Sequence, residues 1–131
     1  MIAVIFEVWP APGRKDDYLR LAALLRDDLD HTDGFISIER FQSLTDPEKV
    51  LSLSVWRDEE AVKAWRNNPR HRASQAQGRG GIFADYRLRI GAIIRDYGMT
   101  ERAQAPADSR RTHEGQGAGQ GAGQGAGQGA L

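Results

Sequence analysis

VWRDEEAVKAW, residues 55–65, joins the end of a predicted strand to the beginning of a predicted helix. Asp58 is suited to be the N-cap of this helix, because a short carboxylate can accept hydrogen bonds from the free N–H groups of the first turn. Before it, the side chains of Lys49–Trp56 alternate in the way that a β-strand requires. The segment therefore predicts a strand followed by a helix, which Asn67-Asn68-Pro69 interrupts.

Another strand precedes this one and pairs with it. Residues from Phe35 to about Leu44 alternate between two sets of side chains, and Thr45-Asp46-Pro47-Glu48 is a turn sequence. A short turn between two strands predicts an antiparallel hairpin. The centre of the domain is therefore expected to be a hairpin that leads into a helix.

Segments on either side complete the domain. Upstream, Ile2–Trp9 is apolar enough for a mostly buried strand, and Arg14–His31 carries apolar residues at spacings of three and four, as an amphipathic helix does. Downstream, Arg70–Gln77 predicts a further helical turn or two, and residues from about Ala84 to Tyr97 predict the last strand. The order is βαββαβ, an α+β ferredoxin-like arrangement in which a four-stranded antiparallel sheet carries its helices on one face.

The other face of the sheet needs a cover. We expect Phe41, Val50 and Trp56 on it, together with a mixed set of side chains from the last strand. A domain of this size does not leave so apolar a face in water. Because two sheets packed together would cover both faces, the sequence predicts a homodimer.

Composition excludes several classes of function. Lys and Arg total 18, as do Asp and Glu, so the net charge is zero and the basic excess of nucleic-acid-binding proteins is missing. The absence of cysteine excludes disulfides and thiolate metal sites. No apolar run approaches the roughly 20 residues that a membrane-spanning helix needs, and no export signal is recognisable. We therefore expect a cytoplasmic protein without nucleic-acid or membrane partners.

The composition changes near Gly98. Between Met99 and Leu131 large apolar residues are almost absent, and Gly115–Ala130 is four copies of Gly-Gln-Gly-Ala. Such a segment cannot bury enough apolar surface to offset the entropy lost on ordering. The sequence thus predicts one domain at residues 1–98 and a disordered tail at residues 99–131.

A specific pattern lies within the domain: Trp56, Ala61 and Trp65 at spacings of five and four, followed by His71. Gly34-Phe35, Phe83 and Tyr86 accompany it. In these residues the chain resembles the antibiotic biosynthesis monooxygenase family over residues 1–97. The resemblance implies a dimeric α/β barrel. It also implies an activity, because one branch of the family oxidises aromatic polyketides with molecular oxygen and without metal or flavin, while another branch degrades haem.

The two branches imply different site residues. The quinone-forming branch places a Trp, an Asn and a Tyr around its substrate, for which Trp65, Asn67 or Asn68, and Tyr86 are the nearest matches. The haem branch uses an Asn near the end of strand one, where this chain has Phe6 or Glu7. It also uses an axial His about ten residues beyond the helix Trp. That position holds Gln75, which cannot supply the imidazole nitrogen that a haem iron binds.

We therefore predict a cofactor-independent monooxygenase that acts on an aromatic or polycyclic small molecule. One alternative is a haem-binding or haem-degrading monooxygenase, and another is a non-catalytic dimeric module that binds a small ligand. The candidate catalytic residues are Trp65 and His71, and no metal site is expected. The candidate substrate contacts are Phe6, Phe41, Asn67 and Tyr86.

Some of these residues could instead have a purely structural role. Trp65 on an amphipathic helix also suits the core, and His71 also suits the surface. The run of Arg66, Arg70, Arg72 and Arg79 is typical of a solvated face, but it could also hold an anionic group of a substrate. Glu7 within an apolar strand is expected to point to an edge or to pair with an arginine such as Arg40 or Arg89.

Overall fold

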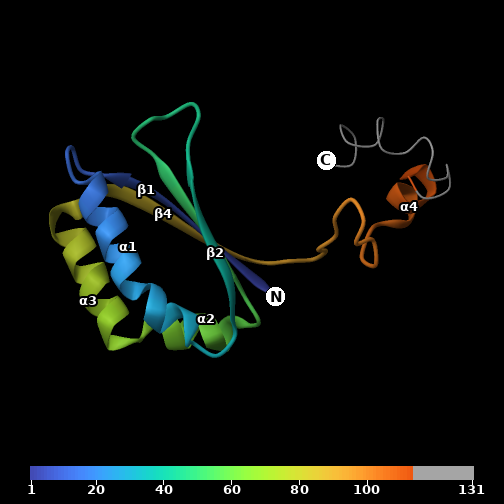
Figure 1. Ribbon diagram of the computed structural model, residues 1–131, viewed down its shortest axis with the longest axis horizontal. Helices are drawn as coiled ribbons and strands as arrows, with labels where there is room; N and C mark the ends of the chain where they lie inside the picture. Colours follow the sequence, from blue (N-terminus) through green and yellow to red (C-terminus); the bar gives the residue numbers. More distant parts are fainter. Residues whose placement is uncertain (114–131) are drawn as a thin grey trace. The chain divides into compact units, whose positions relative to one another are not determined.

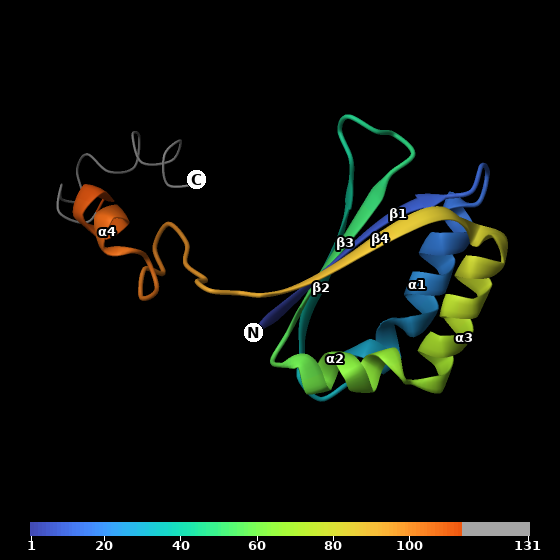
Figure 2. The same ribbon diagram turned by 180° about the vertical axis from the view of Figure 1, so that it is seen from behind.

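The computed structural model describes residues 1–113, drawn in Figures 1 and 2, and divides into a unit at Met1–Ala92 and a second unit from Ile93 onward. The elements of the first unit are β1 (Ile2–Pro10), α1 (Lys15–Asp30), β2 (Phe35–Gln42), β3 (Val50–Trp56), α2 (Glu59–Arg66), α3 (Pro69–Gln77), the wide helical turn η1 (Gly78–Ile82) and β4 (Phe83–Ala92).

The four strands form one sheet in the order β2-β3-β1-β4, and every neighbouring pair is antiparallel. The helices α1, α2 and α3 all lie on the same face of this sheet (Figures 1 and 2). This is the ferredoxin-like βαββαβ fold, so the predicted fold class is confirmed.

Two capping side chains fix where the helices begin. The Asp58 carboxylate accepts a hydrogen bond from the backbone N–H of Ala61 at 2.9 Å, as predicted for the N-cap of α2. Asn68 caps α3 in the same way and accepts from the N–H groups of Arg70 and His71, with Pro69 in the first helical position. The interruption seen in the sequence is thus the start of a new helix, and its cap places His71.

Packing against the sheet forms two separate clusters on its helix-bearing face. The first consists of Val8, Tyr18, Val50 and Ile82, with Phe6, Leu21 and Phe83 packed against it. The second consists of Leu29, Trp56, Ala61 and Val62, with partly buried neighbours that include Phe35 and Trp65. Because Val8 pairs with Val50 and Ile2 pairs with Trp56, the two clusters lie towards opposite ends of β1 and β3.

The expectation that Val50 and Trp56 lie on the uncovered face is wrong. They are 4% and 2% exposed and belong to the clusters beneath the helices. Alternation puts Leu51, Leu53 and Val55 on the outer face instead, where Phe41 pairs with Leu51. Both sets of β3 side chains contain large apolar residues, so the pattern shows that the strand alternates without showing which set faces the helices.

Glu7 lies on the outer face between two cations, and its predicted pairing with Arg89 is confirmed. The second partner is Lys49, whose Nζ lies 2.5 Å from Glu7 Oε2. Chiefly through the hydrogen bond from Lys49, these cations hold the pKa of Glu7 below its usual range. The carboxylate therefore remains charged within an otherwise apolar strand.

β4 (Phe83–Ala92) ends at Ala92, whereas the sequence predicted that the strand continues to Tyr97. Ala92 pairs with Ile2 at the start of β1, so residues beyond Ala92 have no neighbouring strand to pair with.

Within the segment predicted to be disordered, the structure has a short helix, α4 (Ala107–His113), while the Gly-Gln-Gly-Ala repeats lie outside the described residues. Among residues 1–113, no helix is long and apolar enough to cross a membrane.

Candidate active site

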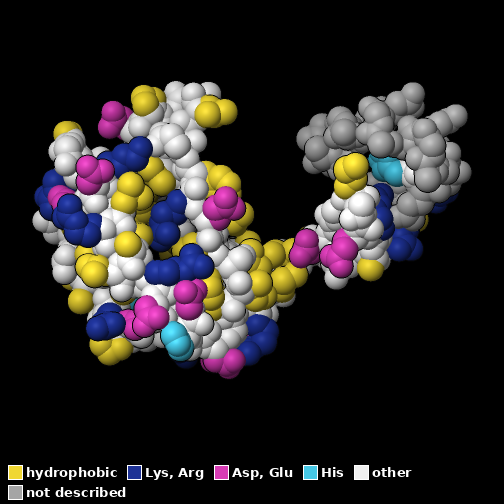
Figure 3. Space-filling view, in the orientation of Figure 1, with side chains coloured by type: hydrophobic (Ala, Val, Ile, Leu, Met, Phe, Trp, Pro, Cys, Tyr) yellow, Lys and Arg dark blue, Asp and Glu magenta, His cyan; other side chains and the backbone are white. Residues whose placement is uncertain are grey.

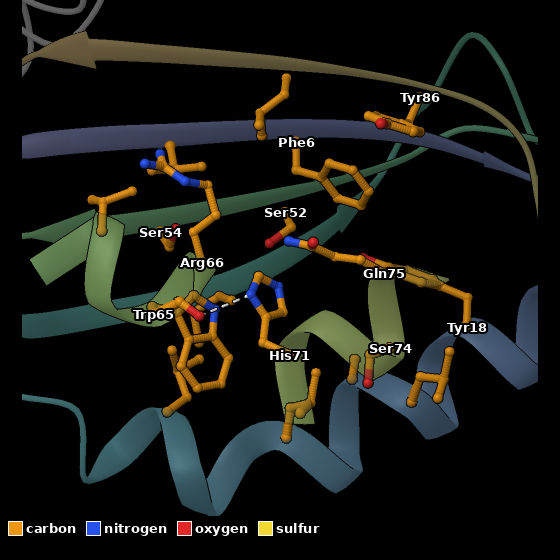
Figure 4. A pocket seen from close by; sticks show the side chains of 18 of the residues that line it. Phe6, Tyr18, Ser52, Ser54, Trp65, Arg66, His71, Ser74, Gln75 and Tyr86 are labelled. Atoms are coloured by element: carbon orange, nitrogen blue, oxygen red, sulfur yellow. Dashed lines mark hydrogen bonds between the residues drawn. The ribbon is translucent and has the colours of Figure 1, made fainter. Parts of the chain in front are cut away.

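A cleft of about 550 Å³ lies between the sheet and the three helices that cover it. The strands contribute one wall, with Phe6 from β1, Ser52 from β3 and Leu88 from β4. The helices contribute the opposite wall, with Trp65 from α2 and His71 from α3. Figure 4 shows the side chains of Phe6, Ser52, Trp65 and His71 converging on one space.

Small side chains on β3 leave room for the cleft. Ser52 and Ser54 are buried on the helix-bearing face between Val50 and Trp56, which belong to the two clusters. Ser54 Oγ accepts a hydrogen bond from Trp56 Nε1 at 2.9 Å. Ser52 is 6% exposed, and its hydroxyl forms no hydrogen bond to any of residues 1–113. A hydroxyl that lines a cleft and has no protein partner is suited to bind a group of a ligand.

His71 is held by the backbone of the helix before it. Its Nδ1 lies 3.1 Å from the carbonyl oxygen of Trp65, and its ring stacks on the Trp65 indole with 4.7 Å between the ring centroids. A carbonyl oxygen can only accept, so Nδ1 carries the proton and donates. In the neutral ring Nε2 then carries a free lone pair. Figure 4 shows the ring beneath Ser52 and the end of Gln75.

The surroundings of His71 favour that neutral form. Burial of the imidazole lowers its pKa from the ordinary value, and the nearby Arg72 guanidinium lowers it further. The hydrogen bond to Trp65 opposes these effects without reversing them. At neutral pH His71 is therefore a proton acceptor already in its receptive state.

Aromatic side chains line the end of the cleft that lies away from Trp65. Phe6 is close to the rings of Phe83 and Tyr86, with centroid distances of 5.8 and 5.6 Å, and Tyr18 packs edge-on against Phe83. Arg79 from η1 donates a hydrogen bond to the Tyr86 hydroxyl at 2.6 Å. This end offers aromatic side chains against which a ring can pack.

The structure brings four of the six predicted site residues together: Trp65, His71, Phe6 and Tyr86. The other two lie elsewhere. Phe41 is 44% exposed on the outer face of the sheet, so it cannot contact a ligand in this cleft. Asn67 is also outside the cleft, where its amide donates to the Lys63 carbonyl oxygen and accepts from Arg72 at 2.7 Å.

Sequence reasoning missed Ser52 and Gln75 as cleft residues. Ser52 had a weak signal, since it is a polar residue in the middle of a strand face that has Val50 and Trp56 at its ends. Gln75 was considered only as the residue that replaces an axial histidine, although its position on α3 brings its side chain over the cleft (Figure 4). Within residues 1–113, no group of three or more His, Asp or Glu side chains is placed to hold a metal ion.

The amino-acid sequence is similar to those of known proteins. The family model for "Antibiotic biosynthesis monooxygenase" matches residues 1–77. Jasmonate monooxygenase ABM of Pyricularia oryzae is 46% identical over 93 residues, which cover 71% of this chain and 43% of that protein. The chain therefore spans less than half the length of this curated relative.

Solved structures show the same fold at low sequence identity. A candidate antibiotic biosynthesis monooxygenase from Deinococcus radiodurans superposes with a TM-score of 0.68 at 11% identity, covering 76% of this chain and 99% of that one. A protein from Mycobacterium tuberculosis superposes with a TM-score of 0.67 at 18% identity, covering 74% and 98% of the two chains.

Proposed function

Because this chain belongs to the antibiotic biosynthesis monooxygenase family, we propose that its cleft oxidises a small cyclic or aromatic molecule with molecular oxygen and without a bound cofactor. The observation that carries the proposal is the neutral His71, whose Nε2 lone pair faces a cleft lined in part by aromatic side chains. A substrate with an acidic C–H or O–H group would lie against this acceptor.

The proposed reaction needs no electrons from outside the substrate. His71 accepts a proton, and the resulting carbanion or phenolate gives its electrons to oxygen. A C–O bond forms to give a peroxide, which then loses water. For a methylene group the balance is R₂CH₂ + O₂ → R₂C=O + H₂O. The Ser52 hydroxyl and the Gln75 amide line the cleft beside His71 (Figure 4), and both can donate a hydrogen bond to the developing oxyanion.

Two lines of support bear on the substrate. The rings of Phe6, Tyr18 and Phe83 favour a flat aromatic or polycyclic body. The name of the Pyricularia oryzae relative points to jasmonate, a cyclic ketone with an acidic side chain. A polycyclic phenol and jasmonate are both small and cyclic. Each carries a phenol or a carbonyl group that makes a proton of the molecule acidic.

Oxygen uptake by the purified full chain tests this function. We expect consumption with an anthrone-type phenol or with jasmonate, in a buffer without metal or reductant, and one atom of labelled O₂ in the product. Uptake only after a reductant is added would contradict cofactor independence. Ligand-induced stabilisation with no uptake under either condition would make the domain a binding module.

Haem is the second candidate ligand, because the free Nε2 of His71 is the type of atom that binds a haem iron. When bound, haem would supply the oxygen activation. Titration with haemin, read at the Soret band, tests this candidate. A saturable band that is lost in His71→Ala would replace the cofactor-independent proposal, and the absence of a specific band would remove haem.

We also propose that two copies pack their sheets together. The outer face carries Leu51, Leu53 and Val55 beside Phe41, and no helix of the Met1–Ala92 unit covers it. An apolar face of this kind marks a protein–protein interface.

Leu53→Lys is expected to yield a monomer, because a second sheet packed on that face would have to bury the ammonium group. The Glu39 carboxylate, which pairs with position 53, can accompany the new charge while the face remains in water. Sedimentation should show the mass falling from twice 14.5 kDa to 14.5 kDa. Leu24→Lys is the matched control, because Leu24 is 68% exposed on α1 on the other side of the sheet. An unchanged dimer in Leu53→Lys would refute this interface.

A further inference from the structure

The cleft has a strong excess of positive charge, although the chain as a whole is neutral. Its lining contains five arginines and no aspartate or glutamate: Arg26, Arg40, Arg66, Arg72 and Arg79. Figure 3 shows Lys and Arg side chains gathered over the hollow between the helices and the sheet, with apolar side chains visible beside them. A partly apolar cleft with charges of one sign focuses its field on a ligand of the opposite sign.

Four of these arginines already have partners. Arg26 pairs with Asp30, and Arg40 donates to the Tyr18 hydroxyl at 3.1 Å. Arg72 donates to Gln75 and Asn67, and Arg79 donates to Tyr86. These contacts fix the four side chains within the protein, and only the partner of Arg26 is an anion.

Arg66 differs from the other four. It forms no hydrogen bond or ion pair with any of residues 1–113, although it follows Trp65 directly and lines the same cleft. Figure 4 shows its side chain extending from α2 toward the sheet, on the Ser54 side of the cleft. Arg66 is exposed at the edge of the cleft. A guanidinium that lines a cleft without an anion beside it is suited to receive one from a ligand.

We propose that the ligand of this cleft is an amphipathic carboxylic acid and that Arg66 binds its carboxylate. This inference rests on the proposed function, since it assigns the substrate class of the same site. A planar carboxylate matches the guanidinium fork and can accept two parallel hydrogen bonds from it. A monoanion fits better than a phosphate, because Arg66 is the one cleft arginine among the described residues without a partner.

The placement of the other residues gives the ligand a direction. Strand register puts Ser54, Ser52 and Val50 in order along β3, and Ser52 pairs with Phe6. Figure 4 shows Arg66 beside Ser54 at one side, Tyr86 and Phe6 at the other, and His71 beneath Ser52 between them. A ligand held by its carboxylate at Arg66 therefore extends its ring toward Phe6. Its middle carbons then lie opposite Nε2 of His71.

Equilibrium binding without oxygen tests the inference separately from turnover. We would titrate the full chain by calorimetry with two pairs of ligands, jasmonic acid with its methyl ester and 2-naphthoic acid with its methyl ester. Each pair keeps the body of the ligand and removes only the negative charge. The variants are Arg66→Gln and Lys63→Gln, which remove the same charge from α2 inside and outside the cleft.

Wild-type protein is expected to prefer at least one acid to its ester by about tenfold or more. Arg66→Gln should bind that acid about ten- to a hundredfold more weakly and its ester within about threefold of wild type, because only the charge-assisted bond is lost. Lys63→Gln should change neither affinity by more than about threefold, because an exposed charge outside the cleft contributes little.

Several outcomes would overturn the inference. Equal affinity of acid and ester, an equal loss for both in Arg66→Gln, or no saturable binding of either acid would each do so. Acid-selective binding without oxygen uptake would leave the carboxylate site standing and would refute the proposed oxidation instead. Turnover of the esters at the rate of the acids would refute only the role of Arg66.

Discussion

Replacing His71 with glutamine is expected to lower kcat for oxygen uptake by about two to four orders of magnitude, the range that a positioned general base contributes. The amide fills a similar space but cannot accept the substrate proton. KM should change little, because the aromatic end of the cleft around Phe6 and Tyr86 remains intact. Steady-state oxygen uptake with an anthrone-type phenol measures both constants.

The matched control is His31→Gln. His31 is exposed at the C-terminal end of α1, where its Nδ1 is hydrogen-bonded to the Asp27 carbonyl, so it has the same backbone contact without a cleft. Its rate should equal that of wild type. A His71→Gln variant that retains more than about a tenth of the wild-type kcat would show that another group removes the proton.

The pH dependence follows from the lowered pKa of His71. The wild-type rate should hold from neutral pH down to below about pH 6.5, the ordinary histidine value, and then fall as the ring takes up its proton. The free energy of unfolding also falls as the pH is lowered. Between the folded and unfolded pKa values the unfolded chain binds more protons, so acidification through this window destabilises the fold. His71→Gln should lose that part of the pH dependence.

Trp56→Ala is expected to destabilise the domain by about 3–5 kcal/mol, the usual loss for a large aromatic side chain removed from a core. Trp56 is 2% exposed and packs edge-on against Phe35, with its Nε1 bonded to Ser54. Small domains have only about 5–15 kcal/mol of stability, so this loss is a large part of the total. Urea unfolding followed by circular dichroism measures it.

Leu24→Ala serves as the reference for Trp56→Ala. The Leu24 side chain is exposed, so the free energy of unfolding of this variant should differ from that of wild type by no more than about 0.5 kcal/mol. The Trp56 variant should also lose activity beyond its loss of fold, because Trp65 packs near Trp56 and holds His71 through its carbonyl oxygen. A fully active Trp56→Ala with unchanged stability would contradict the role of the second cluster.

Local signals in the sequence predicted much of the fold. Asp58 and the alternation of β3 are features of a few neighbouring residues, and the structure has both as predicted. Features that depend on residues far away in the sequence were harder to predict. The end of β4 depends on where β1 begins, and the inward position of Trp56 depends on which face the helices cover.

The sequence likewise predicted only some of the residues of the candidate site. Trp65 and His71 came from a resemblance over a short pattern, and the structure places both in the cleft. Phe41 lies on the outer face, as the sequence predicted, but the cleft is on the other face, so its predicted contact with the substrate does not fit the structure. The partner-free hydroxyl of Ser52 and the partner-free charge of Arg66 could not be foreseen, because the lack of a partner is a property of the three-dimensional surroundings and not of the residue.

The division of the apolar packing into two clusters has a consequence for how the domain behaves when a ligand arrives. The interior is incomplete in its middle, where Ser52 and Ser54 stand in place of larger side chains. A bound molecule would touch Phe6 at one end and Trp65 at the other, and would thus become the part of the interior that the chain itself does not provide. Folding and recognition then depend on the same contacts, so a ligand that fits this cleft should raise the melting temperature, and should raise it more the more tightly it binds.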